Sequence, residues 1–359
     1  MLRVDVETGS HKYPIYIEHG LTAQLGRLIE QSRPASRLFL ISSPLVWKFH
    51  GKAMARAIPK TETILLPDGE KYKQLATASR AYESLIKLDA DRGAGIIAVG
   101  GGVIGDMAGF VAATYLRGIK VIQVPTTLLA QVDSAIGGKV GVNHPLGKNL
   151  IGAFHQPSLV ATDPALLETL PRREFRAGLY EVIKYGMTSS PELFERIDRE
   201  MDAIFARKAG ALVPIIGESC SIKAAVVKLD ERESGPRRML NFGHTAGHAL
   251  EAVTKYKRFR HGEAIAYGML VAAEIGVARG VMPGADREAL GKMIIKLGPL
   301  PPVGDLSTRD MLEAIRHDKK VVNGTLHYVL CTGIGSWTTA TDVTEEELAK
   351  ALRKVGLKK

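Results

Sequence analysis

Three side chains of this sequence have the chemistry of a divalent-metal site. Glu181 lies in G-L-Y-E-V-I-K-Y-G, His244 in N-F-G-H-T-A-G-H and His261 in H-G-E. One carboxylate and two imidazoles supply three ligands and leave a fourth position for substrate or water, as in a catalytic zinc site. Glycine and alanine beside each residue allow close backbone approach and leave room for an ion. The combination predicts an enzyme.

The choice of histidines stays open at this point. A single histidine on an apolar face is more often a hydrogen-bonded core residue than a ligand, so the prediction depends on the three residues together. His244 and His248 are four residues apart and would share one face of a helix. Spacing alone does not decide whether His248 or His261 joins His244 at the metal.

A glycine-rich turn follows a predicted strand and opens a predicted helix. Its glycines at 100, 102 and 105 match the dinucleotide fingerprint, in which a pyrophosphate meets the amide groups of a helix N-terminus. The acidic residue expected about 20 residues later for a ribose hydroxyl is missing. We therefore expect a variant nucleotide fold rather than a standard Rossmann domain, with a purely structural turn as the alternative.

Two further segments are suited to anions and hydroxyl groups. The loop at residues 67–73 places Glu70 and Lys73 three residues apart at the start of a helix. Between residues 124 and 157, glycines stand beside Lys139 and Lys148, and Asn149 follows directly. Ammonium and amide groups without bulky neighbours can bind an oxyanion such as phosphate.

The first half of the chain alternates strand and helix patterns. A helix is expected over Lys73 to Leu88. Strands are expected over Leu2–Glu7, Tyr13–Ile17, Arg37–Ser42, Thr63–Leu66, Gly95–Val99 and Ile119–Val124. This alternation predicts an α/β nucleotide-binding domain with a mostly parallel sheet, whose ligands bind beyond the carboxyl ends of the strands.

The pattern changes after the prolines at 164 and 171. From residue 172 onward long helical patterns dominate, with one hairpin expected from Leu326–Leu330 and Trp337–Thr339. We therefore predict an NAD-binding α/β domain over residues 1–171 and a mainly α-helical metal- and substrate-binding domain over residues 172–359.

Composition narrows the class of partner. The net charge is +10, from 48 basic and 38 acidic residues, but aromatic residues make up only 6% and the basic residues are scattered. This favours a small anionic substrate over nucleic acid, which would need a basic stripe with stacking aromatics. Glycines and Asp106 interrupt the most apolar stretch, residues 93–113, so no membrane partner is expected. The N-terminus has no secretory pattern and the only cysteines are Cys220 and Cys331, which predicts a cytoplasmic protein with free thiols.

Eight motifs in order resemble the 3-dehydroquinate synthase family over nearly the whole length. They are G-G-G-V-I-G-D, V-P-T-T-L-L-A, G-G-K, P-L-G-K-N-L-I-G-A-F, E-V-I-K-Y-G, N-F-G-H-T-x-G-H, H-G-E and D-K-K. The resemblance implies a lyase that uses NAD and Zn²⁺ or Co²⁺. It would convert 3-deoxy-D-arabino-heptulosonate 7-phosphate to 3-dehydroquinate and phosphate in the shikimate pathway. The steps would be transient oxidation, phosphate elimination, re-reduction and intramolecular aldol closure.

The resemblance also implies roles for individual residues. The metal ligands would be Glu181, His244 and His261, which leaves His248 on the substrate side. The phosphate would contact Lys139, Asn149, His248, Lys319 and, from a partner subunit of a homodimer, Arg117. The substrate carboxylate would contact Lys223 and Arg237, and its hydroxyls Asp133, Lys184 and Asn241. Cofactor contacts would fall on Glu70, Lys73, Gly101, Gly102, Asp106, Thr126, Thr127, Asp133, Lys139, Lys148, Leu166, Thr169, Leu170 and Glu174.

One position departs from the family pattern, and at another position two adjacent residues fit the pattern equally well. The family usually has an acidic residue after an early strand to hold the adenosine ribose, whereas this chain has Ser43, which donates a hydrogen bond but carries no charge. Lys319 and Lys320 are adjacent, so either fits the phosphate position. 

Three other functions compete with this interpretation. A related cyclase for a neutral sugar phosphate, such as 2-deoxy-scyllo-inosose synthase, would not need the cationic pair of Lys223 and Arg237. A polyol dehydrogenase of related fold would release NADH. A basic nucleic-acid-binding protein would bind duplexes in a salt-sensitive way.

Overall fold

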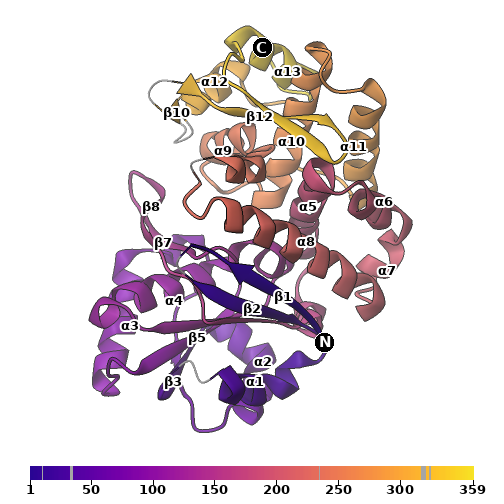
Figure 1. Cartoon of the computed structure of the whole chain (residues 1–359). Coiled ribbons are helices and arrows are strands. Elements are labelled where there is room, and N and C mark those ends of the chain that lie inside the picture. The colour runs from indigo at the N-terminus through magenta and orange to yellow at the C-terminus, as the bar shows by residue number, and fades with distance from the viewer. Residues whose placement is uncertain (10, 33–34, 234, 317–320, 323–324) are drawn as a thin grey trace. The chain divides into compact units, whose positions relative to one another are not determined.

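The chain folds into two compact units, described here from a computed structural model. The structure describes residues 1–9, 11–32, 35–233, 235–316, 321–322 and 325–359 (Figure 1). The first unit contains Met1–Phe175 and Asp202–Arg232, and the second contains Arg176–Met201 and Glu233–Lys359. The chain thus passes between the units more than once, and residues 202–232 pack with the first unit. The division into functional domains at 171/172 stays a prediction.

A seven-stranded sheet forms the centre of the first unit, in the order β1-β2-β9-β6-β5-β3-β4. Only the edge pair β1–β2 is antiparallel, and the other neighbours are parallel, as the strand and helix alternation predicts. The predicted strands are all present, with ends shifted by no more than a residue or two. Their bounds are β1 Leu2–Glu7, β2 Lys12–Ile17, β3 Arg37–Ser42, β4 Glu62–Leu65, β5 Ala94–Gly100, β6 Lys120–Pro125 and β9 Leu159–Thr162.

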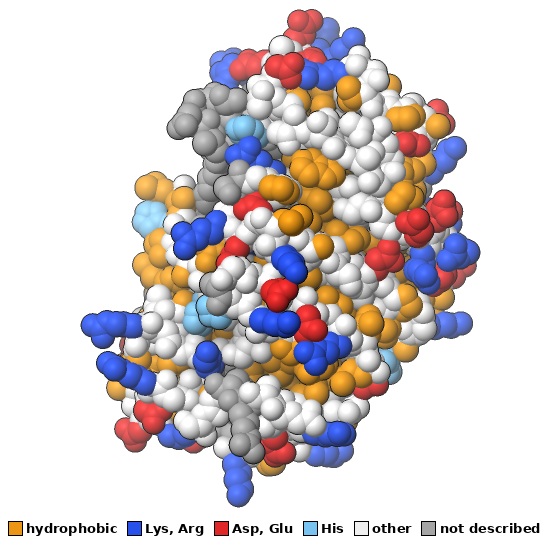
Figure 2. Space-filling view, in the orientation of Figure 1, with side chains coloured by type: hydrophobic (Ala, Val, Ile, Leu, Met, Phe, Trp, Pro, Cys, Tyr) orange, Lys and Arg blue, Asp and Glu red, His pale blue; other side chains and the backbone are white. Residues whose placement is uncertain are grey.

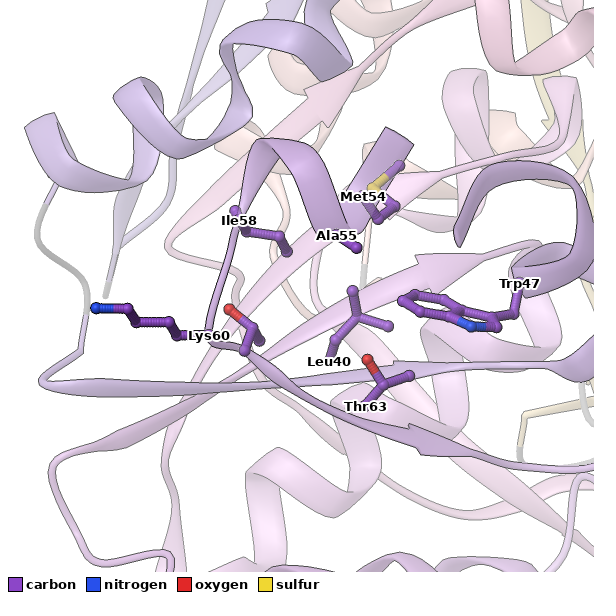
Figure 3. A pocket seen from close by; sticks show the side chains of 8 residues that line it. Leu40, Trp47, Met54, Ala55, Ile58, Lys60 and Thr63 are labelled. Carbon is purple, nitrogen blue, oxygen red and sulfur yellow. The ribbon is translucent and has the colours of Figure 1, made fainter. Parts of the chain in front are cut away.

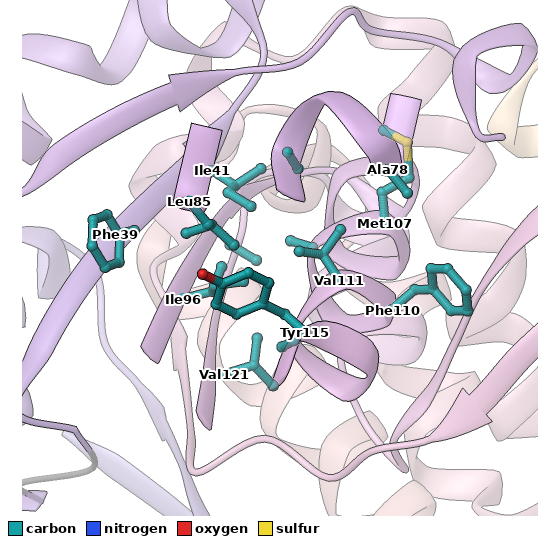
Figure 4. Packing of buried hydrophobic residues seen from close by; sticks show 14 of the residues in the cluster. Phe39, Ile41, Ala78, Leu85, Ile96, Met107, Phe110, Val111, Tyr115 and Val121 are labelled. Atoms are coloured by element: carbon teal, nitrogen blue, oxygen red, sulfur yellow. The ribbon is translucent and has the colours of Figure 1, made fainter. Parts of the chain in front are cut away.

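Helices cover both faces of this sheet because its strands are apolar on both sides. Phe39, Ile41 and Ile96 point to one face and pack with helices α3 and α4 (Figure 4). Leu40 and Ile97, one residue further along the same strands, point to the other face and pack with α1 and α2. The helices of this unit are η1 Leu21–Gln24, α1 Leu25–Ser32, α2 Pro44–Ala57, η2 Glu70–Tyr72, α3 Leu75–Lys87, α4 Gly102–Thr114, η3 Tyr115–Arg117, η4 Ala130–Ser134, η5 Pro164–Thr169, α7 Met201–Phe205 and α8 Ala209–Leu229.

The glycine- and lysine-rich segment after β6 forms a hairpin that the periodicity does not predict. Strands β7 (Lys139–His144) and β8 (Gly147–Phe154) pair in an antiparallel ladder. Gly141 and Gly152 face each other across it, and a Cβ atom on Gly152 would lie 2.4 Å from the Val140 carbonyl oxygen. These glycines therefore allow a closer strand approach than other residues would.

The second unit is mainly helical, as predicted, with the expected hairpin near the C-terminus. Strands β12 and β13 pair from Tyr328–Ala340 to Gly333–Ser336. The elements are α5 Arg172–Ser189, most of which belongs to this unit, α6 Pro191–Arg199, η6 Pro236–Asn241, α9 His244–Val253, α10 His261–Ala278, α11 Gly284–Leu297, α12 Thr308–Arg316, β10 Val321–Val322, β11 Thr325–Leu326, β12 Tyr328–Gly333, β13 Ser336–Ala340 and α13 Glu345–Lys354.

Helix α8 is long and apolar enough to cross a membrane by length and composition alone. Of its most apolar window, 61% is buried inside the protein. The helix packs against β1, β2 and η4 of the first unit. A buried core helix of a soluble protein has the same composition, so this helix is weak evidence for a membrane span.

Candidate active site

Close packing of glycines brings three helices of the second unit together around Glu181. A Cβ atom on Gly262 of α10 would lie 1.9 Å from the Ala177 carbonyl oxygen of α5. A Cβ atom on Gly268 of α10 would lie 1.8 Å from the carbonyl oxygen of Gly243, the residue before α9. Only glycine fits at these two positions, so H-G-E and N-F-G-H-T-A-G-H contain the contacts that set the helix spacing.

Glu181 lies on α5 with its carboxylate fully buried, at 0% exposure. Its Oε1 is 3.7 Å from His244 Nε2 and 3.6 Å from His261 Nε2. Its Oε2 forms an ion pair with the ammonium group of Lys184, one turn further along the helix. Its Oε1 accepts no hydrogen bond from the residues that the structure describes. Lys184 therefore compensates one side of the buried carboxylate, and Oε1 is left to bind a metal ion together with the two imidazoles.

The two histidines facing Glu181 each begin a helix, and each has an acceptor near Nδ1. His244 is the first residue of α9, and its Nδ1 is 3.1 Å from the Phe242 carbonyl oxygen. His261 is the first residue of α10, and its Nδ1 is 3.2 Å from Glu251 Oε2. A proton on Nδ1 donates to these acceptors and leaves the Nε2 lone pair directed at Glu181, which is the tautomer that binds a metal ion.

These residues fit a divalent metal ion. Two ligand atoms that each lie about 2.0–2.2 Å from one tetrahedral ion are about 3.3–3.6 Å apart. The separations of 3.6 and 3.7 Å between Glu181 and the two imidazoles are close to that range. Nitrogen atoms of His244, His248 and His261 all lie within 4.8 Å of one another, so His248 belongs to the same cluster. The direction of Glu181 Oε1 favours His244 and His261 as the ligands.

The glycine turn of the first unit ends β5 and begins α4, as its sequence predicts. Gly101 is the N-cap of α4, and Gly102 is its first residue. Thr126 and Thr127 follow the end of the neighbouring strand β6, and a Cβ atom on Gly101 would lie 2.9 Å from Thr127 Cγ2. The first amide groups of α4 therefore point past small residues at the carboxyl edge of the sheet, which suits a pyrophosphate.

Beside this turn lies a network of predicted cofactor residues. Lys73 Nζ donates to Asp106 Oδ2 at 2.5 Å and to Asn149 Oδ1 at 2.6 Å. Burial raises the pKa of the Asp106 carboxyl, and the Lys73 ammonium opposes that rise. Asn143 donates to Glu70 Oε1 at 2.7 Å and accepts from the Asn149 backbone at 2.9 Å. The structure thus joins the loop at residues 67–73, the first turns of α4 and the β7–β8 hairpin.

Matches to known families decide the class of this chain. Residues 63–177 match the family model described as 3-dehydroquinate synthase N-terminal, and residues 178–321 match the one described as 3-dehydroquinate synthase C-terminal. The chain is 45% identical to the 3-dehydroquinate synthase of Solibacter usitatus (strain Ellin6076), over 97% of this chain and 98% of the relative. It is 46% identical to that of Pelotomaculum thermopropionicum, over 93% of this chain and 92% of the relative.

The chain belongs to the 3-dehydroquinate synthase family. The predicted function is confirmed with it: a phosphate-eliminating cyclase that forms 3-dehydroquinate in the shikimate pathway.

Solved structures of other sugar phosphate cyclases share this fold. The 2-epi-5-epi-valiolone synthase of Streptomyces hygroscopicus subsp. jinggangensis 5008, with NAD⁺ and Zn²⁺ bound, has a TM-score of 0.88 and 26% identity, over 99% of both chains. A 2-deoxy-scyllo-inosose synthase with carbaglucose-6-phosphate, NAD⁺ and Co²⁺ has a TM-score of 0.87 and 26% identity, over 98% of this chain and 100% of that one. The predicted fold class and the predicted cofactors, NAD with Zn²⁺ or Co²⁺, agree with these structures.

The other predicted substrate residues of this 3-dehydroquinate synthase family member lie in both units. In the first unit, Lys223 Nζ on α8 donates to the side chain and the backbone carbonyl of Asp133, both at 2.6 Å. Lys139, at the start of β7, is exposed. In the second unit, Arg237 is buried in η6, and Asn241 Nδ2 donates to Glu233 Oε1 at 2.7 Å.

The remaining predicted cofactor residues lie on either side of the start of α5. Leu166 is buried in the core, Leu170 and Glu174 are partly buried, and Thr169 Oγ1 is 2.9 Å from His50 Nε2. Lys148 Nζ is 3.9 Å from Glu70 Oε1. Lys319 and Lys320 lie outside the described residues, so the choice between them stays open.

Two residues that sequence reasoning missed support predicted site residues. Glu251 contacts His261, and Asn143 links Glu70 to Asn149. Glu251 follows His244 by seven residues on one helix, a spacing that puts both on the same face and was the available signal. Asn143 offers no comparable signal, because its partners come from segments far along the chain.

One hollow in the first unit lies apart from the predicted site residues. A hollow of about 210 Å³ lies between α2 and the strands β3 and β4, lined largely by Leu40, Trp47, Met54 and Ile58 (Figure 3). It contains none of the predicted site residues. On the face shown in Figure 2, basic side chains stand among acidic ones.

Proposed function

We propose that Glu181, His244 and His261 hold the divalent metal ion with which this chain converts 3-deoxy-D-arabino-heptulosonate 7-phosphate. The observation that carries this proposal is the buried Glu181 carboxylate, whose Oε1 faces the Nε2 atoms of both histidines at 3.6–3.7 Å. The cofactors bound in the two solved cyclases support NAD with Zn²⁺ or Co²⁺ here. When bound, NAD takes up and later returns a hydride, and the metal ion polarises the substrate hydroxyl beside it.

The first unit would bind NAD at the turn after β5. Gly101 and Gly102 would admit the pyrophosphate to the amide groups of α4, with Thr126 and Thr127 beside them. Glu70, Lys73, Asp106 and Lys148 would hold the hydroxyls and phosphates of the cofactor. The hydrogen bond between Lys73 and Asp106 and the ion pair between Lys148 and Glu70 support this role, because side chains already held in place lose little freedom when the cofactor binds.

The two anionic ends of the substrate would be bound by different side chains. Lys223, held by Asp133 at 2.6 Å, and the buried Arg237 would bind the carboxylate. Lys139, Asn149, His248 and Lys319 would bind the phosphate. Fixing both ends keeps the reacting atoms near their attack geometry, a contribution of about 7–11 kcal/mol when alignment is complete.

Proton transfer would accompany phosphate loss. Lys184, Asp133 and Asn241 would orient the hydroxyls of the substrate. The substrate's own phosphate oxygen or His248 would remove the proton next to the transient ketone, and general-base help of this kind contributes about 10²- to 10⁴-fold in rate. The position of His248 within the histidine cluster supports this role, because a substrate held beside the proposed metal ligands would lie next to it.

We also propose a cytoplasmic homodimer in which Arg117 reaches the partner's site. Leu116 and Arg117 have φ values of 49° and 70°, before Gly118 at 125°. A left-handed conformation costs a residue other than glycine about 1–2 kcal/mol, and such strain is often kept where function requires it. Mixing inactive Arg117→Ala and Lys139→Ala proteins should restore part of the activity, since one site of a mixed dimer is intact. No recovery after verified subunit exchange would contradict a shared site.

One assay tests the reaction itself. The purified protein is incubated with the heptulosonate phosphate, NAD and Zn²⁺, while phosphate release and NADH absorbance are followed together. We expect phosphate release without net NADH, because the hydride taken up is returned within the same cycle. Stoichiometric NADH accumulation would instead indicate a dehydrogenase.

A further inference from the structure

The turn that precedes Lys139 consists of two glycines. Gly137 and Gly138 have φ values of 89° and 68°, in the left-handed region that favours glycine. They lie between η4 and β7, and β7 begins at Lys139. Glycine permits this path, but it also gives the backbone more freedom than any other residue. The position of Lys139 therefore depends on contacts that fix the two glycines from outside the turn.

Tyr13 makes such a contact with Gly137. Its side chain is 1% exposed and comes from β2, in the sheet of the first unit. The phenolic oxygen accepts a hydrogen bond from the backbone amide of Gly137, which is also buried, at 3.0 Å. A buried amide that loses its acceptor is costly, so this bond ties the turn to the sheet. The two residues are 124 positions apart, and the sequence pattern gives no sign of the contact.

Gly138 is fixed from the end of β8. Its carbonyl oxygen accepts a hydrogen bond from the His155 backbone at 2.7 Å. The side-chain amide of Gln156 packs on the same glycine, because a Cβ atom on Gly138 would lie 2.7 Å from Gln156 Cδ. Gln156 Nε2 in turn donates to Glu231 Oε1 at 2.8 Å, which holds the amide in place. The hairpin thus fixes the second glycine, and Tyr13 fixes the first.

We propose that Tyr13 is a positioning residue, which orients Lys139 toward the substrate phosphate by holding the turn at Gly137. A phenylalanine in its place would fill the same space and offer the amide no acceptor. The turn would then have other arrangements open to it, in which the Lys139 ammonium lies away from the phosphate. The proposal rests on the phosphate-binding role proposed above for Lys139.

The test compares two ligands that differ only in the phosphate. They are 3-deoxy-D-arabino-heptulosonate 7-phosphate and the same sugar acid without its phosphate. Equilibrium binding of each is measured on the whole purified protein with Zn²⁺ and NADH, which cannot take up a hydride, so that no turnover occurs. The ratio of the two affinities reports the contribution of the phosphate, and a merely structural role of Tyr13 would not change it.

The variants are Tyr13→Phe, Lys139→Met and the double variant. Tyr267→Phe is the matched control, because the Tyr267 hydroxyl also makes a hydrogen bond with the backbone, to the Pro301 carbonyl oxygen at 2.9 Å, but lies on α10 of the second unit. Melting temperatures establish that each variant is folded.

We expect Tyr13→Phe to weaken binding of the phosphorylated ligand about twofold to tenfold, the range for one neutral hydrogen bond. Binding of the ligand without phosphate should stay the same, and Tyr267→Phe should bind both ligands like the parent. Lys139→Met should lower the affinity ratio further. In the double variant the tyrosine substitution should add nothing to the loss, because no ammonium is left to position.

Three outcomes would overturn the positioning role of Tyr13. They are an unchanged affinity ratio in Tyr13→Phe, equal weakening of both ligands in that variant, and a full additional loss in the double variant. An unchanged ratio in Lys139→Met would instead refute the phosphate-binding role of Lys139, so the two failures are distinguishable.

Gly138→Ala tests the same turn without altering Tyr13, and it replaces Tyr13→Phe if that variant does not fold. The added Cβ atom would press on Gln156 and displace the turn, so the affinity ratio should fall. A folded Gly138→Ala protein with the ratio of the parent would show that the turn does not position Lys139, which would also overturn the proposal.

Discussion

The predicted site residues of the first unit differ from those of the second unit in how their charges are compensated. In the first unit, Lys73 donates to Asp106 and Asn149, and Lys223 donates to Asp133, so each ammonium has oxygen acceptors within 2.5–2.6 Å. In the second unit, Glu181 Oε2 pairs with the Lys184 ammonium, whereas Oε1 faces two imidazole nitrogens and has no hydrogen-bond donor among the described residues. The residues of the first unit form a hydrogen-bonded network that a cofactor can join, whereas those of the second unit leave one carboxylate oxygen and two imidazole nitrogens for a metal ion to bind. We therefore expect NAD to add little to the stability of the fold and the metal ion to add much.

Substitution of the proposed metal ligands should give the largest effect. Glu181→Ala, His244→Ala and His261→Ala should each abolish activity and weaken metal binding by more than about 100-fold, beyond the range for residues that only support a ligand. His248→Ala should keep the metal and lose turnover. Elemental analysis and activity of each purified variant check both statements. If His248→Ala lost the metal ion and His261→Ala retained it, His248 rather than His261 would be the metal ligand.

Lys73→Met tests whether the network in the first unit compensates its own charges. The Lys73 side chain is only 5% exposed, so its loss leaves the Asp106 carboxylate without its ammonium partner. Breaking a buried pair in this way costs about 3–5 kcal/mol in free energy of unfolding. The control is Lys228→Met, because Lys228 forms an exposed pair with Glu7 and should cost less than about 1 kcal/mol.

Denaturant titration measures both variants in the same buffer. If Lys73→Met were no less stable than Lys228→Met, the compensation inferred for the first unit would be wrong. The double variant with Asp106→Asn should recover part of the lost stability, because the uncompensated carboxylate is then removed as well.

Arg237→Ala should weaken binding of the substrate far more than binding of NAD. A hydrogen bond to a charged group contributes roughly 1.5–3 kcal/mol, which corresponds to a 10- to 150-fold loss of affinity. A substrate analogue without the carboxylate should bind the variant and the parent equally well. Equal weakening toward the substrate and the analogue would remove Arg237 from the carboxylate and favour a neutral sugar phosphate as substrate.

Glu251→Gln should give the smallest of these effects. The amide of glutamine still accepts a hydrogen bond from His261 Nδ1 but lacks the charge that strengthens the imidazole as a ligand. Loss of such a partner costs about 10- to 100-fold in metal affinity, and the conservative substitution should fall at the lower end. Competition with a coloured chelator measures the affinity. Glu274→Gln is the matched control, since Glu274 is a buried glutamate of α10 that pairs with Arg287 and Lys354 instead.

The sequence by itself determined the local elements and the chemistry of the chain. Residues such as Arg37–Ser42 form a buried strand because a short run of apolar side chains suits a strand that is covered on both faces, and the predicted and observed bounds coincide. The glycine turn after β5 and the H-G-E and N-F-G-H-T-A-G-H segments were likewise readable, since glycine spacing beside a functional side chain is a local property. The order of these motifs was sufficient to indicate the family.

Only the tertiary structure decided which of these groups meet. Glu181 and His261 are far apart along the chain, and they meet because Gly262 packs on Ala177 at a distance that no side-chain pattern encodes. Ser43 is buried and donates to Asp68, a residue 25 positions further along the chain, and the two residues meet because β3 and β4 pair side by side. The partners of a side chain and its exposure arise from the packing of distant segments, whereas the periodicity of a sequence reports only on neighbours along the chain.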